Sequence, residues 1–163
     1  MMNWTDMSTQ PTLYLMCGLP GAGKTTRARE IEQTAPALRL TPDEWMVPLF
    51  GEQHSTPELL RARDTIEGLL FELAERALKL GINVVVDYGV WSRTERETFR
   101  ARARAAGAKT ELIYLDVPIE ELKARVEARN RNLDGKVYPI TKEEMDLWAT
   151  WFERPAPEEL IPD

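Results

Sequence analysis

The chain contains few of the side chains that form disulfides or hold transition metals. Its 163 residues include one cysteine, Cys17, and one histidine, His54. One cysteine excludes an internal disulfide and a cysteine-rich metal site, and one histidine excludes a histidine cluster. We therefore expect any general base to be a carboxylate. Cys17 ends an apolar run, which favours a small buried hydrophobe over a nucleophile.

Basic residues and long apolar runs are also scarce. Lys and Arg total 21 against 27 Asp and Glu, which gives a net charge of −6 and an isoelectric point near 5.0. This balance disfavours a nucleic acid as the main partner, although it leaves room for a local basic patch. No apolar run approaches the ~18 residues of a membrane-spanning helix, and no signal-peptide pattern opens the chain. The sequence thus predicts a cytoplasmic protein without a membrane partner, and it leaves the oligomeric state open.

The stretch Gly18–Thr25 carries the strongest chemical signal. Its sequence, GLPGAGKT, fits the phosphate-binding pattern in which two glycines separated by four residues precede Lys and Thr. Residues 12–17 come before it as an apolar run that predicts a buried strand, and residues 24–35 follow with the apolar spacing of a helix. A glycine-rich loop between a strand and a helix can surround a polyphosphate with backbone N–H groups. We therefore expect a nucleoside triphosphate to bind here.

The residues of this loop have expected roles in nucleotide binding. Lys24 should reach the β- and γ-phosphates, and the Thr25 hydroxyl should ligate Mg²⁺. Thr26 lies within reach of the α-phosphate. Because Pro20 has no N–H, the donated hydrogen bonds are assigned to the amides of residues 21–26. The expected cofactors are ATP and Mg²⁺, and the expected nucleotide-binding residues are Gly18, Pro20, Gly21, Ala22, Gly23, Lys24, Thr25 and Thr26.

The rest of the chain alternates predicted strands with predicted helices. Apolar runs predict strands at residues 37–40, 82–87 and 111–115, and the valine-rich 82–87 is expected to be central. A helix is expected from residue 118, and capping sequences predict further helix starts at residues 41–44, 55–58, 92–95 and 141–144. This alternation predicts an α/β fold with a doubly wound parallel sheet covered on both faces. The length is that of one domain, residues 11–163, with residues 1–10 as a flexible lead-in.

Three segments carry more detailed expectations. Thr41 is expected to be an N-cap, with Glu44 closing a capping box. The helix after residue 57 is expected to bury one apolar face, made of Leu59, Ile66, Leu70, Leu73, Ala77 and Leu80. The aromatic residues of the last helix are expected to be core: Trp148, Trp151 and Phe152. Pro155 and Pro157 are then expected to end regular structure.

Two carboxylates are expected at the carboxyl ends of the strands, where ligands bind in such sheets. Asp87 follows three valines, and beside a phosphate loop it is predicted to hold Mg²⁺ directly or through water. The alternative is an Asp that only begins a turn before Gly89. Asp43 lies in the first turn of a helix, where it can accept the proton of an attacking hydroxyl. The alternative there is a structural acid that the helix dipole favours.

Two arginines are candidates for stabilising a transferred phosphoryl group. Arg125 and Arg129 continue the helical stripe that Leu122 begins, so they are expected to point towards the strand ends. A guanidinium there stabilises charge on phosphate oxygens. The alternative is an exposed ion pair, such as Glu121 with Arg125.

Three further arginines are weaker candidates. Arg131 can pair with Glu127 on its own helix. Arg93 and Arg96 follow the central strand, and the sequence leaves open whether they bind substrate or are solvated helix residues.

Together these motifs resemble the small P-loop kinases of the group that contains zeta toxin, chloramphenicol phosphotransferase and the 5′-kinase domain of polynucleotide kinase. The resemblance covers nearly the whole chain and rests on residues 18–26, Asp43, residues 84–87 and the pair Arg125 and Arg129. It implies a three-layer P-loop NTPase fold of the AAA type, with a small parallel sheet, helices on both faces and a helical lid at about residues 130–140. Such a lid closes to exclude water.

The resemblance also implies catalytic roles. In such enzymes the residue matching Asp43 is the general base, the Lys and Thr of the loop hold MgATP, and paired arginines clamp the phosphates. Polynucleotide kinases usually carry an Arg three residues after the catalytic Asp, whereas this chain has Met46 there.

The resulting hypothesis is an ATP-dependent kinase that transfers the γ-phosphoryl group to a hydroxyl of a small-molecule acceptor, with Asp43, Lys24, Arg125 and Arg129 as catalytic residues. A polynucleotide 5′-hydroxyl kinase and a nucleotide-dependent ATPase or switch without an acceptor are the alternatives. The identity of the acceptor and the preference for ATP or GTP stay open.

Overall fold

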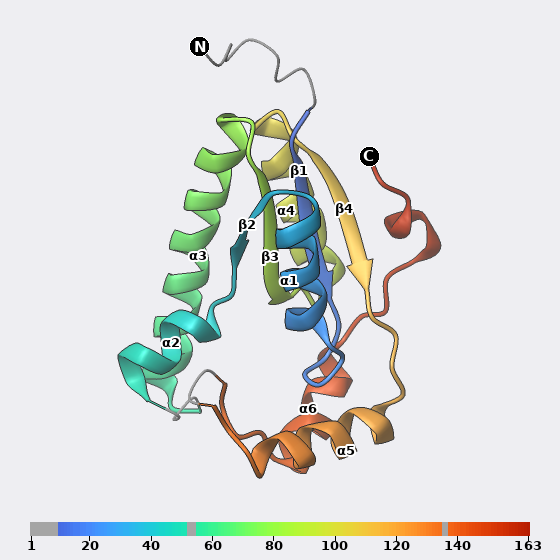
Figure 1. Cartoon of the computed structure of the whole chain (residues 1–163). Coiled ribbons are helices and arrows are strands. Elements are labelled where there is room, and N and C mark those ends of the chain that lie inside the picture. The colour runs from blue at the N-terminus through green and yellow to red at the C-terminus, as the bar shows by residue number, and fades with distance from the viewer. Residues whose placement is uncertain (1–9, 52–54, 135–136) are drawn as a thin grey trace.

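A parallel sheet lies at the centre of the protein (Figure 1). The computed structural model describes residues 10–51, 55–134 and 137–163. Within these ranges the sheet has four strands in the order β2-β3-β1-β4. Their bounds are β1 Thr12–Cys17, β2 Ala37–Leu40, β3 Asn83–Gly89 and β4 Lys109–Tyr114. The four predicted strands are confirmed, and β3 lies inside the sheet as its valines indicated.

Helices connect the strands and continue after the last one. Their bounds are α1 Lys24–Thr34, α2 Asp43–Phe50, α3 Pro57–Lys79, α4 Arg93–Ala105, α5 Ile119–Asn130 and α6 Lys142–Trp151. A 3-10 turn, η1, follows at Pro157–Leu160. The expectation that Pro155 and Pro157 end regular structure is therefore wrong by one turn, because a proline is compatible with the first position of a helical turn.

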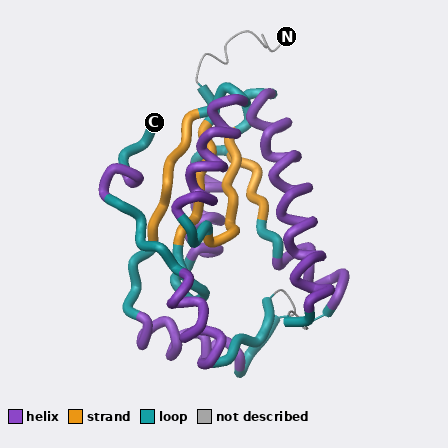
Figure 2. Tube along the Cα trace, turned by 180° about the vertical axis from the view of Figure 1, so that it is seen from behind, coloured by secondary structure: helices purple, strands orange, loops and turns teal. Residues whose placement is uncertain are grey.

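The sheet has a helical layer on each face (Figure 2). Ala28 and Ile31 of α1 pack against Met16 and Val85 on one face. Residues of α3 and α4 pack against the alternating side chains on the other face, including Leu13, Leu15, Val84, Val86 and Leu112. Successive side chains of a strand point to opposite faces of the sheet, so each interior strand contributes side chains to two apolar clusters. The predicted three-layer α/β architecture is confirmed.

The buried face of α3 agrees with the predicted one only in part, because Leu70 and Ala77 are buried and Ile66 packs against the core. Leu73 and Leu80 are exposed, whereas Phe71, Ala74 and Leu78 are buried. The buried residues follow the spacing i, i+3 and i+7, so the helix meets the sheet through the stripe that carries its aromatic side chain. Leu80 lies past the last helical residue. Both apolar stripes have helical spacing, so periodicity alone does not choose between them.

Side-chain caps are present at three of the four helix starts that capping sequences predicted, whereas α2 begins at Asp43 without its predicted cap. The hydroxyls of Thr56 and Ser92 accept backbone N–H bonds, and Thr141 forms a full capping box with Glu144. Thr41 caps nothing with its side chain, because its hydroxyl accepts from Arg39 Nη1 at 2.6 Å and donates to Asp87 Oδ2 at 3.1 Å. The predicted capping box at Thr41 is therefore wrong.

The carboxyl ends of the strands point towards α2, α5 and α6, which lie across the lower edge of the sheet in Figure 1. The predicted lead-in, residues 1–10, falls outside the described residues except for Gln10, and His54 falls outside them as well. Among the helices that the structure describes, none combines the length and the apolar character that crossing a membrane requires.

Candidate active site

The glycines of the phosphate loop are required by its backbone and by a neighbouring helix. Gly21 has a φ of +84°, and a Cβ placed there would lie 3.0 Å from Val126 Cγ2 and 3.1 Å from the Leu122 carbonyl oxygen. Gly23 has a φ of +94° immediately before α1. L-residues with side chains rarely adopt such dihedrals. The loop is therefore shaped by glycine on one side and packed against α5 on the other.

A cavity of about 930 Å³ opens beside this loop. It brings together ten of the residues predicted from the sequence: Pro20, Gly21, Gly23, Lys24, Thr25, Thr26, Asp43, Asp87, Arg125 and Arg129. Gly18 and Ala22 do not line it. The Gly18 carbonyl accepts from Trp91 Nε1 at 3.2 Å, and the Ala22 N–H donates to the Leu19 carbonyl at 3.2 Å. These two residues therefore contribute to the shape of the loop without lining the cavity.

Lys24 lies at the centre of the cavity wall. Its Nζ donates to the Leu19 carbonyl oxygen at 3.0 Å, so the side chain folds back over the loop. Burial lowers the pKa of the Lys24 ammonium, and the charges of Asp87 and Asp43 oppose that shift. The ammonium group therefore lies within the field of both predicted functional carboxylates.

Asp87 forms a short hydrogen-bonded chain with two threonines. Its Oδ2 accepts from Thr25 Oγ1 at 2.6 Å and from Thr41 Oγ1 at 3.1 Å. Burial raises the pKa of Asp87, and the hydrogen bond from Thr25 and the charge of Lys24 counteract part of this rise. The sequence predicted Thr25 and Asp87 as ligands of the same Mg²⁺ ion. It missed the contact between Thr41 and Asp87, because Thr41 was interpreted as a helix cap.

These oxygens fit Mg²⁺ better than a transition metal. Hydroxyl and carboxylate oxygens are the ligands that Mg²⁺ prefers, and it usually keeps several waters and substrate phosphates in its coordination sphere. The described part of the chain holds no group of three or more His, Cys, Asp or Glu side chains suited to enclosing a metal ion. A site with Thr25 and Asp87 as its protein oxygens would therefore leave most of the coordination sphere to water and phosphate oxygens.

Asp43, the first residue of α2, pairs with an arginine that no sequence pattern singled out. Arg63 Nη1 lies 2.8 Å from Asp43 Oδ1, and Arg63 Nε lies 2.9 Å from Glu67 Oε1. Arg63 and Glu67 both belong to α3. No short motif links positions twenty residues apart, so only the packing of α2 on α3 reveals this contact.

Arg125 and Arg129 both reach the cavity, but in different settings. Arg125 is exposed and binds Glu121 Oε1 at 2.5 Å, which is the alternative left open by the sequence, and it also donates to the Gly21 carbonyl at 3.3 Å. Arg129 is half-buried and donates to the Tyr138 carbonyl at 3.3 Å. Burial lowers the pKa of the Arg129 guanidinium, and the charge of Asp43 opposes this.

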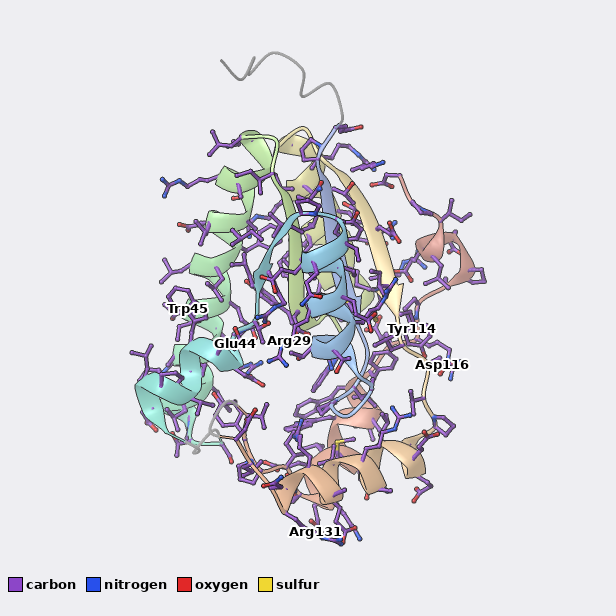
Figure 3. All side chains as sticks on the ribbon, in the orientation of Figure 1. Arg29, Glu44, Trp45, Tyr114, Asp116 and Arg131 are labelled. Atoms are coloured by element: carbon purple, nitrogen blue, oxygen red, sulfur yellow. The ribbon has the colours of Figure 1, made fainter. Side chains whose placement is uncertain are left out.

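Further charged residues lie at the rim of the cavity. Arg29 of α1 and Glu44 of α2 point towards one another, with 3.6 Å between Nη2 and Oε1 (Figure 3). Glu44 Oε1 also lies 2.9 Å from Arg39 Nη1. Glu44 of α2 is thereby connected to α1 through Arg29 and to β2 through Arg39. Arg131 pairs with Glu127 at the protein surface, as the sequence allowed.

Aromatic side chains form another wall of the cavity, and this corrects one expectation. Trp151 is 56% exposed and lines the cavity together with Trp148, so Trp151 is not a core residue. Trp148 packs against Trp91 with ring centroids 5.7 Å apart. Tyr88 also lines this wall. Because α6 folds back across the strand ends, its aromatic stripe faces the cavity as well as the core.

Arg96 is neither a substrate ligand nor a solvated residue. Its side chain is buried, pairs with Glu159 at 2.8 Å, and donates to the carbonyls of Val90, Trp91 and Glu153. Val90 has a φ of +34°, which is unfavourable for a β-branched residue, and it lines the cavity. Arg96 therefore anchors a strained turn of the site to the C-terminal segment. Arg93 is exposed and pairs with Glu97.

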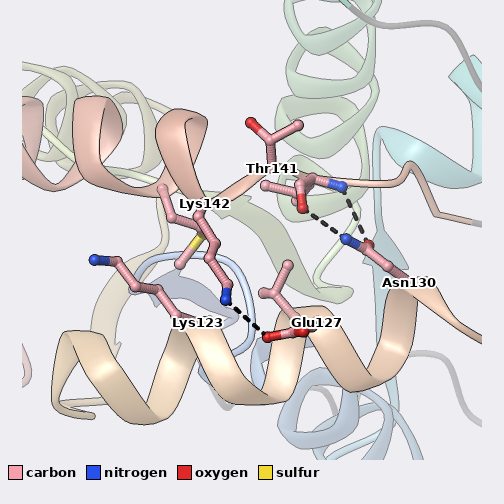
Figure 4. Close-up of a pocket in the computed structure, with 8 residues that line it drawn as sticks. Lys123, Glu127, Asn130, Thr141 and Lys142 are labelled. Carbon is pink, nitrogen blue, oxygen red and sulfur yellow. Dashed lines mark hydrogen bonds and ion pairs between the residues drawn. The ribbon is translucent and has the colours of Figure 1, made fainter.

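The predicted lid corresponds to the connection between α5 and α6. The Asn130 side chain fixes Ile140 near the end of this connection, donating to the Ile140 carbonyl at 2.6 Å and accepting from the Ile140 N–H at 3.1 Å. A smaller cavity of about 170 Å³ lies between the two helices, where Lys142 pairs with Glu127 at 3.1 Å (Figure 4). The described part of the connection is not helical, although helices flank it, and its closure stays a prediction.

The three-layer fold agrees with a comparison to known families. Residues 13–155 match the family described as an AAA domain. The chain belongs to this family. None of the curated proteins compared with the chain matches it.

Solved structures show where the fold of this AAA domain recurs. A chain of the Pnkp1/Rnl/Hen1 RNA repair complex has a TM-score of 0.71 and 22% identity over 92% of this chain, which spans 46% of that one. A gluconokinase from Sinorhizobium meliloti 1021 has a TM-score of 0.64 and 17% identity, with 93% and 80% of the two chains covered. Kti12 from Chaetomium thermophilum, in complex with ADP-AlF3, has a TM-score of 0.66 and 18% identity, with 90% and 82% covered.

These likenesses establish the P-loop NTPase fold. Together with the family match, they confirm the resemblance to small P-loop kinases at the level of family and fold.

Proposed function

We propose that this AAA domain is an ATP-dependent kinase that transfers the γ-phosphoryl group to a hydroxyl of a small-molecule acceptor. The observation that carries the proposal is that the phosphate loop, Asp43 and Arg129 line one cavity. A loop that only binds nucleotide needs no carboxylate across from it, whereas transfer to a hydroxyl needs a proton acceptor near the terminal phosphate. The similarity to a gluconokinase and to a protein bound to ADP-AlF3 supports the same chemistry.

The phosphate loop holds the nucleotide in this proposal. The amides of the loop and the Lys24 ammonium bind the β- and γ-phosphates. Thr25 and Asp87 supply the protein oxygens for Mg²⁺, which when bound neutralises charge on the phosphate oxygens. The Lys24 ammonium uses one of its three N–H donors for the Leu19 carbonyl, and a phosphate oxygen is a charged acceptor that gives a stronger hydrogen bond.

Asp43 takes the proton in the transfer step. The acceptor oxygen forms a bond to the γ-phosphorus, the bond from that phosphorus to the bridging oxygen breaks, and its electron pair leaves with ADP. Asp43 accepts the proton that the acceptor hydroxyl loses. Arg129 and Arg125 stabilise the charge on the transferring group. Closure of the α5–α6 connection over the site excludes water as a competing acceptor.

A 5′-hydroxyl end of RNA is the second candidate acceptor, because this chain shares its fold with part of an RNA repair complex. The charge balance of the cavity lining opposes it, because seven acidic residues face five basic ones: Asp43, Glu44, Asp64, Glu67, Asp87, Glu95 and Asp134 against Lys24, Arg29, Arg63, Arg125 and Arg129. Carboxylates repel a phosphate backbone, and binding of such an acceptor depends steeply on salt. We therefore favour an acceptor without phosphate groups.

An ADP-release assay tests the proposal. The panel contains sugars, nucleosides, aminoglycosides, other hydroxyl-bearing antibiotics and short 5′-hydroxyl oligonucleotides, each offered with Mg²⁺ and ATP. We expect at least one non-nucleic acid compound to raise ADP release above the water background, and Asp43→Asn to reduce that rate by about 10²- to 10⁴-fold. Glu30→Gln, a change on the exposed side of α1, is the matched control and keeps the rate.

The outcomes of this assay separate the three functions. Turnover with oligonucleotides alone supports the RNA-end kinase. A panel without any active compound, together with slow ATP hydrolysis, supports a nucleotide-dependent switch. Full turnover in Asp43→Asn removes the assignment of Asp43 as the base.

A further inference from the structure

In the contacts that the structure describes, another side chain holds one of the two oxygens of the Asp43 carboxylate. Its Oδ1 accepts from Arg63 Nη1 at 2.8 Å, and the two side chains are about equally exposed, 30% and 31%. Both line the large cavity. The guanidinium therefore reaches Asp43 at the edge of the space where the acceptor must lie.

Arg63 is itself fixed at the surface of α3. Its Nε lies 2.9 Å from Glu67 Oε1, one helical turn further along the same helix. The Tyr88 hydroxyl donates to the Glu67 backbone carbonyl at 2.9 Å, which ties this turn of α3 to the end of β3. The guanidinium thus bridges a carboxylate on α2 and a carboxylate anchored beside the sheet.

We propose that Arg63 is a positioning residue, which holds Asp43 Oδ1 so that Oδ2 faces the acceptor hydroxyl, and that Glu67 in turn holds Arg63. This inference rests on the proposed function. A carboxylate on the first residue of a short helix can rotate about its side-chain bonds, and a misplaced base loses rate even where the fold is intact. A partly exposed ion pair contributes little to stability, so tying α2 to α3 is a minor part of what this contact provides.

The test compares Arg63→Ala, Arg63→Gln and Arg63→Lys with Arg61→Ala, an exposed arginine on the same helix. Each variant is assayed for ADP release with the panel compound that gives the highest rate, or with water as acceptor where none exceeds it. We expect Arg63→Ala and Arg63→Gln to lower kcat about 100-fold, with the KM for ATP changed less than threefold. Arg63→Lys recovers part of kcat, because it restores the charge without the planar fork. Arg61→Ala leaves both constants unchanged.

Chemical rescue separates positioning from a structural role. Guanidinium chloride at low millimolar concentration should raise kcat of Arg63→Ala at least fivefold, and it should leave Asp43→Asn and the wild type unchanged. A contact that only stabilises the fold gives no such rescue. Its loss lowers the melting temperature and leaves the orientation of Asp43 unchanged. Glu67→Gln should lower kcat less than Arg63→Ala does.

Two results overturn the inference. If Arg63→Ala keeps the wild-type kcat, Arg63 has no positioning role. Loss of activity in Asp43→Asn under the same conditions then leaves the proposed function intact. Loss of kcat in Arg63→Ala without guanidinium rescue assigns Arg63 a structural role only. If Arg63→Ala does not fold, the kcat and KM of Arg63→Lys and Arg63→Gln decide in the same way. Full activity in Asp43→Asn removes the base assignment and the inference together.

Discussion

Arg63 Nη1 lies 2.8 Å from Asp43 Oδ1, and this ion pair joins α3 to the first residue of α2 beside the phosphate loop. The pair places a carboxylate and its cation at the cavity that also holds Lys24. The negative charge of Asp43 in turn favours the charged form of the Lys24 ammonium. Groups on three separate elements are therefore coupled at the point where a terminal phosphate would meet an acceptor.

Asp87→Asn is expected to stabilise the fold while it impairs function. Burial raises the pKa of Asp87, so the ionised side chain destabilises the folded state at neutral pH. The variant should melt at a higher temperature than the wild type at pH 7.5, and the difference should shrink as the pH falls towards 4. It should also need about 10- to 100-fold more Mg²⁺ for half-maximal ADP release. A variant that melts lower at pH 7.5 would show that the hydrogen bonds from Thr25 and Thr41 outweigh desolvation.

Arg129→Ala should lower kcat more than Arg125→Ala. Arg129 is half-buried and near the charge of Asp43, whereas Arg125 is exposed and shared with Glu121. Removal of one preorganised donor costs roughly 10²- to 10³-fold in kcat, and we expect Arg129→Ala to lie in that range. Steady-state ADP release measures the effect, with Arg131→Ala as the control. Equal losses in the two variants would contradict the ranking.

Arg96→Ala should destabilise the protein strongly. Arg96 forms a buried pair with Glu159 and donates to three backbone carbonyls. Removal of one partner of a buried ion pair costs about 3–5 kcal/mol. Arg93→Ala, an exposed change on the same helix turn, should alter the free energy of unfolding by less than about 0.5 kcal/mol. Urea unfolding compares the two, and a small loss in Arg96→Ala would show that the C-terminal segment is not held by this residue.

Cys17 should be inert in the folded protein. The side chain is buried, and burial raises the pKa of its thiol to about 12, so little thiolate forms at pH 8. A disulfide reagent such as DTNB should label no thiol in the native protein and one per chain in denaturant. Rapid labelling under native conditions would show that the end of β1 opens.

Glu67 should make the stability of the fold depend on pH. Its side chain faces Arg63 and Asp64 on α3, Tyr88 on β3 and Glu95 on α4. Burial raises the pKa of Glu67 from 4.5 to about 7. The protonated form therefore contributes stability fully below pH 4.5, and this contribution is lost as the pH rises through 7.

Glu67→Gln removes that dependence. Relative to this variant, the wild type should lose on the order of 3 kcal/mol in free energy of unfolding between pH 4.5 and pH 8. Urea unfolding across this pH range gives the difference, and Glu72→Gln is a control on the same helix. A difference that stays constant with pH would place the pKa of Glu67 near its ordinary value.

Local patterns in the sequence predicted the fold and ten of the residues that line the cavity. Valine runs, capping residues and the glycine pattern are local, and they correctly gave the strands, most helix starts and the loop. Arg63 and Trp151 enter the site through packing between distant elements, and periodicity does not show which helix face meets the cavity. Thr41 shows the opposite kind of error. The local capping pattern is present in the sequence, but the Thr41 hydroxyl binds the buried carboxylate of Asp87 and forms no cap.

A crystal structure with Mg²⁺ and a non-hydrolysable ATP analogue tests the central claim most directly. The claim predicts that the loop amides and Lys24 hold the β- and γ-phosphates, with the terminal phosphorus facing Asp43 across the cavity. A polyphosphate bound elsewhere, or an Asp43 carboxylate that points away from the terminal phosphorus, would contradict it.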